Sequence, residues 1–81
     1  MSLQWHQRYG AVVAQGSVYS FVVSSTRHGG QMRWIALYHP PDAPQGAYCE
    51  VPGRYTVTRR EAMAKAEAFE DSCVTIVVDK D

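Results

Sequence analysis

The hydrophobic pattern in the first half of the chain has the period of two that is typical of β-strands. Residues 17–25 alternate between polar and apolar side chains, and residues 32–39 are rich in aromatic and branched side chains. Between them, the stretch TRHGGQ (26–31) contains Gly29-Gly30, which supplies the positive φ angles of a hairpin tip. Pro40-Pro41 ends the second strand, because proline cannot donate a ladder hydrogen bond.

The segment 2–16 allows two interpretations. Its apolar residues recur at i, i+4, i+7 and i+8 from Trp5, which fits one face of a helix. Gly10 lies in the middle of the segment and would cost such a helix about 1 kcal/mol relative to alanine. Residues 9–14 also suit a strand, which Gly16-Ser17 would join to the next strand as a tight hairpin. We favour the strand.

Two short strands are expected after a loop over residues 40–47. Residues 48–51 suit a short edge strand, and Pro52-Gly53 suits positions i+1 and i+2 of a type II turn. Residues 54–57 then continue as a strand.

Helical signals are strongest after residue 57. Thr58 and Glu61 have the spacing of a capping box, in which the hydroxyl and the carboxylate each bind a backbone N–H of the other residue. An apolar stripe at helical spacing follows: Ala62, Met63, Ala66 and Phe69. The pattern predicts a helix over residues 59–71. The apolar run CVTIVV (73–78) then predicts a final, central strand.

The predicted fold is therefore α+β, one domain over residues 1–81, in the order β-β-β-(β)-α-β. It consists of a small, mostly antiparallel sheet of four to five strands with one helix packed on one face. Because one helix covers only one face, we expect the other face to be covered by the N-terminal segment, a second subunit or a partner.

Composition is that of an ordinary globular protein, with 46% apolar and 20% charged residues. The formal net charge is zero, which gives no overall attraction to nucleic acid or anionic membranes. There is no apolar signal run or membrane-length segment, and two cysteines (Cys49 and Cys73) are few for a small secreted scaffold. We expect a cytoplasmic protein with reduced cysteines.

No motif in the sequence indicates catalysis, a metal site or a cofactor. His28, His39, Cys49 and Cys73 lack the short spacing that local zinc chelation favours. His39 and Cys49 could pair as base and nucleophile, but no oxyanion-hole signature accompanies them. The adjacent acids Glu70-Asp71 are interpreted as a solvated helix end. We therefore expect a protein that is not an enzyme.

Charge is distributed unevenly between the two parts of the chain. Residues 1–60 contain six arginines and two acids, a balance of +4, whereas residues 61–81 contain two lysines and six acids, a balance of −4. The two parts could neutralise each other in the fold, or could orient a charged partner. Arg59-Arg60 would oppose the helix dipole in the first turn of the predicted helix. These arginines either bind the acidic tail at Asp79 and Asp81, lie in solvent, or contact a partner.

Arginine and aromatic side chains dominate the energetics of protein interfaces. On that basis the candidate partner-binding residues are Arg27, His28, Arg33, Trp34, Arg54, Arg59 and Arg60.

The stretch Thr58-Arg-Arg-Glu-Ala-Met-Ala-Lys-Ala resembles a pattern in small phage and prophage proteins, in which strands lead through a capped helix to a last strand. Several anti-CRISPR inhibitors are similar in size and build over residues 17–78. The resemblance implies a small non-catalytic protein-binding module, such as a phage-encoded inhibitor that occludes a CRISPR-type host defence complex. The alternatives are a self-associating accessory protein, for example a homodimer, and a nucleic-acid-binding module that uses a sheet face.

Overall fold

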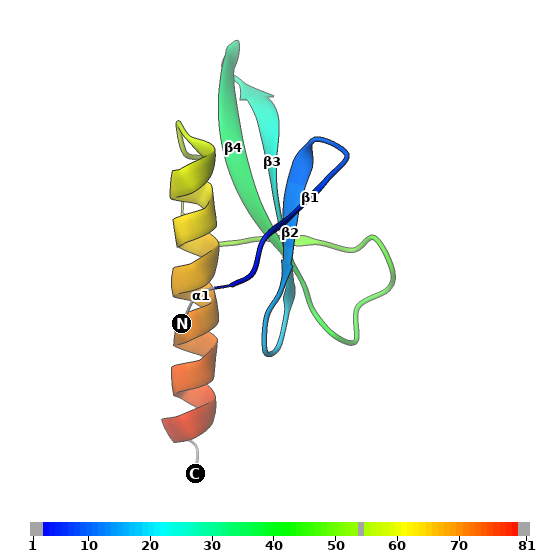
Figure 1. The fold of residues 1–81 in the computed structure, drawn as a ribbon, viewed down its shortest axis with the longest axis vertical. Helices are drawn as coiled ribbons and strands as arrows, with labels where there is room; N and C mark the ends of the chain where they lie inside the picture. Colours follow the sequence, from blue (N-terminus) through cyan, green and yellow to red (C-terminus); the bar gives the residue numbers. More distant parts are fainter. Residues whose placement is uncertain (1–2, 54, 80–81) are drawn as a thin grey trace.

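The computed structural model describes residues 3–53 and 55–79, which form an antiparallel sheet and one long helix (Figure 1). The strands are β1 (His6–Arg8), β2 (Ala11–Gln15), β3 (Ser20–His28), β4 (Gln31–His39) and β5 (Cys49–Glu50), and they lie in the sheet in chain order. The helix, α1 (Arg59–Asp79), packs against β3 and β4. The predicted α+β class, with a small antiparallel sheet and one helix, is confirmed.

Two hairpins end in two-residue turns with the same backbone geometry. Gly29 and Gly30 have φ angles of 62° and 79°, and the flanking residues His28 and Gln31 pair in the ladder. Tyr9 and Gly10 have φ angles of 49° and 80° between β1 and β2. Positive φ at both central positions is the type I′ geometry, whose twist matches that of the flanking strands. The N-terminal segment therefore forms two strands rather than a helix.

The core lies between α1 and one face of the sheet. Phe21, Val23 and Ala36 on the sheet are fully buried against Ala62 and Ala66 on the helix. Alanine at both helix positions removes side-chain bulk, so the helix backbone can approach the strands closely. Five larger apolar side chains pack around this centre: Trp5, Tyr19, Trp34, Tyr38 and Phe69.

The start of α1 is capped as predicted. The Glu61 backbone N–H donates to Thr58 Oγ1 at 3.2 Å, and the Thr58 N–H donates to Glu61 Oε1 at 3.2 Å. These two bonds satisfy donors that the first turn of a helix leaves free. The cap fixes the residue at which the helix begins.

The prediction of a final strand over residues 73–78 is wrong, because α1 continues through this stretch to Asp79. A run that is apolar at nearly every position has no periodicity to separate helix from strand. Adding one residue to an existing helix requires no new nucleus, and a β-branched residue costs only about 0.5 kcal/mol more than alanine there. The element order is therefore five strands followed by one helix.

Smaller corrections concern the strand ends. β3 begins at Ser20 rather than residue 17, because residues 16–19 form a turn in which the Gly16 N–H donates to Tyr19 O at 2.8 Å. The predicted strand over 54–57 is reduced to an isolated bridge between Trp34 and Thr56. Position 54 itself lies outside the described residues.

Candidate functional site

Four of the predicted partner-binding residues lie toward the same end of the molecule. Arg27 and His28 end β3 at the tip of the β3–β4 hairpin, and Arg59 and Arg60 begin α1; all four are exposed. Figure 1 shows the hairpin tip and the start of the helix together at the upper end of the long axis, which extends 46 Å. We call Arg27, His28, Arg33, Arg59 and Arg60 the basic end.

Arg33 is half-buried at the base of this hairpin tip. Its guanidinium donates to the carbonyl oxygen of Met32 at 2.9 Å and to the Gln31 side chain. The His28 ring packs at a tilt of 39° against Tyr55, with ring centroids 4.5 Å apart. Together with Glu50 and Gly53, these residues line a hollow of about 340 Å³. Neighbours within the fold therefore hold the positions of Arg33 and His28.

The other two predicted partner-binding residues, Trp34 and Arg54, are not included in the basic end. Trp34 is half-buried and packs against the core, and its backbone forms the bridge to Thr56. Its indole is therefore part of the packing around the core. Arg54 lies outside the described residues.

Acidic residues gather around the middle of α1. Glu67, Glu70 and Asp71 lie two to three turns beyond Arg59 and Arg60. Because the helix continues unbroken to Asp79, that residue is about 30 Å from Arg59 along the axis at 1.5 Å per residue. Within the described part of the chain, neither arginine pairs with an acid. The interpretation in which Arg59 and Arg60 bind Asp79 is therefore wrong, and Asp81, the other acid it named, lies outside the described residues.

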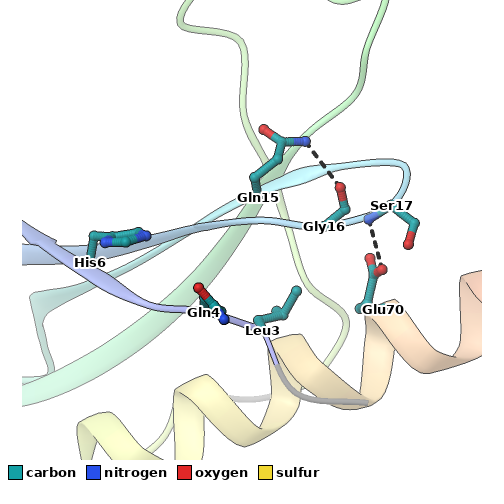
Figure 2. A pocket seen from close by; sticks show the side chains of 7 residues that line it. All are labelled: Leu3, Gln4, His6, Gln15, Gly16, Ser17 and Glu70. Atoms are coloured by element: carbon teal, nitrogen blue, oxygen red, sulfur yellow. Dashed lines mark hydrogen bonds between the residues drawn. The ribbon is translucent and has the colours of Figure 1, made fainter.

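The sequence did not predict the burial of Glu70. We expected Glu70-Asp71 to be a solvated helix end, but only 1% of the Glu70 side chain is exposed. Its Oε2 accepts a hydrogen bond from the Ser17 N–H at 2.8 Å (Figure 2). One signal in the sequence could have shown this: Glu70 follows Ala62 and Ala66 at i+8 and i+4, on the apolar stripe.

The pair His39 and Cys49 gains no support as a catalytic dyad. The Nε2 atom of His39 lies 3.0 Å from the carbonyl oxygen of Pro44, and its ring packs edge-on against Tyr48 at 5.3 Å. Cys49 is a free, exposed thiol on β5.

The centre of the sheet face opposite α1 carries aliphatic side chains. Cross-strand pairing aligns Val13, Val22 and Leu37 in one row of half-buried residues on this face. Five aromatic residues pack on the helix side, whereas Tyr48 lines a hollow with Val13 and Val22, and Tyr55 lies against His28. Two exposed aromatics remain in the described residues, Tyr9 at a hairpin turn and Tyr48 in a loop. A continuous aromatic platform for stacked bases is therefore not formed on the open face.

Comparison with protein-family models, curated proteins and solved structures gave no significant match. Over the described residues, no helix combines the length and the apolar character that crossing a bilayer would require.

Proposed function

We propose that this chain is a non-catalytic protein-binding module whose basic end contacts an acidic surface on a partner protein. The observation that carries the proposal is the exposure of Arg59 and Arg60 at the start of α1, with no acidic partner among the described residues. Arg27 and Arg33 on the β3–β4 hairpin add two more guanidinium groups at this end of the molecule, Arg27 on the α1 side of the sheet and Arg33 on the opposite side. Guanidinium groups bind carboxylates with two parallel hydrogen bonds, which favours arginine at such surfaces.

The two helix arginines are unfavourable for the helix itself. The N-terminus of a helix carries a partial positive charge, so each cation in the first turn costs about 0.3–1 kcal/mol at low salt. Glu61 offsets only part of this repulsion, since it supplies one negative charge against two positive ones in the first turn. A cost to folding without a compensating contact within the fold is typical of residues retained for binding.

A protein partner suits the charge distribution better than a nucleic acid does. The chain is neutral overall, and the acidic residues of its helix would be repelled by an extended array of phosphates. A folded partner presents a limited acidic patch, which can meet the basic end alone. The lack of an aromatic face on the open side of the sheet points the same way.

The proposal is tested by affinity capture from a bacterial lysate with the immobilised chain and its Arg59→Glu/Arg60→Glu variant. Captured proteins are identified by mass spectrometry, and binding is then measured with the purified partner at low and physiological salt. We expect the double variant to lose about tenfold or more in affinity, and the wild-type affinity to fall as salt rises.

The matched control is Arg8→Glu, which reverses an exposed arginine on β1 at the far edge of the sheet. It should change capture less than twofold. Equal loss in the control and the double variant would contradict a localised basic surface. Capture that disappears after nuclease treatment of the lysate would assign the surface to nucleic acid instead.

A narrower form of the proposal is a phage-encoded inhibitor that occludes a host defence complex of the CRISPR type. It relies on the resemblance around Thr58–Ala66 and on the small non-catalytic build. The last strand of that pattern is replaced by helix in this chain, so the capped helix start is the part that remains. Capture of a subunit of such a complex would support this form.

A further inference from the structure

A second feature, independent of the proposed function, lies where the N-terminal segment crosses the second half of α1. An open pocket of about 460 Å³ lies here, lined by Leu3 and Gln4, by the β2–β3 turn and by Glu70 of α1 (Figure 2). A volume of this size is in the range of small-molecule sites. The hydrogen bond from Trp5 Nε1 to Glu67 Oε2, 3.1 Å long, ties the N-terminal segment to the helix beside the pocket.

The Glu70 carboxylate forms the inner wall of this pocket and is only half satisfied. Figure 2 shows it rising from the helix toward the β2–β3 turn, where its Oε2 accepts from the Ser17 N–H at 2.8 Å. Its Oε1 is buried and has no hydrogen-bond partner in the described part of the molecule. A buried carboxylate oxygen without a donor costs free energy, so a donor that reaches it would be bound favourably.

Glycine at position 16 lets the carboxylate occupy this place. A Cβ atom there would lie 2.3 Å from Glu70 Oε1 and 2.9 Å from its Cδ. The neighbouring Gln15 side chain is already committed, because its Nε2 donates to Gly16 O and its Oε1 accepts from Ser20 Oγ. Gln15 therefore shapes the pocket but supplies no donor to Glu70.

The character of the lining indicates a cationic ligand. Among the described residues, no lysine or arginine lines the pocket, and the basic side chain present there is the imidazole of His6. A second carboxylate, Glu67, lies one helical turn before Glu70 and is half-buried. An aliphatic wall is available at Leu3, and an amide at Gln4. This combination suits a group with one positive charge, N–H donors and a short alkyl chain.

We propose that the pocket binds a primary alkylammonium group, which donates a hydrogen bond to Glu70 Oε1 while its alkyl chain packs on Leu3. The group can belong to a free amine or to a lysine side chain, and both present the same chemistry to Glu70. Tetramethylammonium carries the same charge but no N–H, so it should not replace them.

The test is an NMR titration of the ¹⁵N-labelled chain with n-butylamine at neutral pH, and separately with Nα-acetyl-lysine methylamide. The amide of Ser17, which donates to Glu70, and the ¹³C-labelled carboxyl of Glu70 are the reporters. We expect saturable shifts of both signals with the two ammonium ligands and none with tetramethylammonium. The tighter of the two ligands identifies the source of the ammonium group.

Two variants separate the site from the general acidity of the helix. Glu70→Gln should weaken n-butylamine binding about tenfold or more. Asp71→Asn, the same loss of charge at the next residue, should weaken it less than about threefold, because Asp71 is exposed and does not line the pocket. The proposal is overturned if the Ser17 and Glu70 signals of the wild-type chain do not shift with n-butylamine, or shift equally with tetramethylammonium. It is also overturned if a folded Glu70→Gln chain binds n-butylamine as the wild type does.

Discussion

A methyl group at position 16 would meet two buried side chains at once. The Cβ of an alanine there would lie 2.3 Å from Glu70 Oε1 and 2.9 Å from Phe21 Cε2. Phe21 is fully buried, so its ring has little room to move. Gly16 is not among the glycines with positive φ, so alanine suits the backbone and the collision with these side chains is the main effect.

The expected cost follows from what must move. Forcing an extra carbon into a packed region costs about 1–3 kcal/mol. If the Glu70 carboxylate turns away, its bond from the Ser17 N–H is lost as well, and hydrogen bonds to charged groups contribute about 1.5–3 kcal/mol. We expect Gly16→Ala to lower the free energy of unfolding by about 2–4 kcal/mol. A chain of 81 residues has roughly 4–12 kcal/mol in total, so the variant should still fold.

Urea unfolding followed by tryptophan fluorescence measures this loss. Gly46→Ala is the matched control: position 46 has a φ of 87° and open space around it, so only backbone strain of about 1–2 kcal/mol is expected. A double-mutant cycle with Glu70→Ala isolates the contact, and we expect a coupling free energy of about 1–2 kcal/mol. Coupling below about 0.5 kcal/mol would refute the close approach of Gly16 and Glu70.

Three further changes test the local physics of the fold, each by urea or thermal unfolding. Thr58→Ala removes the capping oxygen that accepts the Glu61 N–H, and should cost about 1 kcal/mol; an unchanged midpoint would contradict the cap. Ala66→Leu enlarges a fully buried helix position under the sheet and should cost about 1–3 kcal/mol, unless the helix is free to move outward. Tyr9→Asn should stabilise the chain by about 0.5 kcal/mol, since asparagine tolerates the positive φ of this exposed turn position better than tyrosine; a loss of stability would argue against the turn type.

Features of the fold that depend on neighbours in the sequence could be predicted. Gly29-Gly30 can adopt the turn they form with little help from the rest of the chain, and the Thr58–Glu61 cap needs only four residues. The β1–β2 turn was harder, because Tyr9 has a positive φ that its residue type disfavours. The pairing of β1 with β2 determines the conformation of Tyr9, which its residue type alone does not predict.

The end of the helix depends on a competition that the sequence pattern does not settle. Residues 73–78 have the composition of a buried strand, but a strand needs a free sheet edge and a connection that returns to it. Both sheet edges are occupied by short strands, β1 and β5, and the helix before residue 73 is already formed and capped. Continuing the helix provides hydrogen bonds for the backbone N–H and C=O groups of these residues and leaves both sheet edges unchanged.

The basic end and the Glu70 pocket differ in how far each could be predicted from the sequence. Charge asymmetry along the chain indicated the arginines of the basic end, but their gathering depends on the long hairpin and the helix start lying at one end of the molecule. Glu70 was misread because an acid next to another acid is usually solvated. Its place on the stripe of Ala62 and Ala66 was the better guide, since helical spacing decides which side chains face the sheet.

The continuous helix also changes how the two charged regions are related. Had the chain returned as a strand, its acidic tail could have reached Arg59 and Arg60, and the two charges could have neutralised each other. Because the helix runs on, Asp79 lies about 30 Å from Arg59, which is nearly four Debye lengths at physiological salt. Glu70 lies ten residues from Arg60, about 15 Å along the axis and about two Debye lengths, so the two regions interact only weakly and each can have a ligand of opposite charge. Salt should accordingly weaken the binding of an acidic partner at the arginines without affecting whether the Glu70 pocket discriminates between ammonium and tetramethylammonium, because that discrimination depends on N–H donation and not on charge.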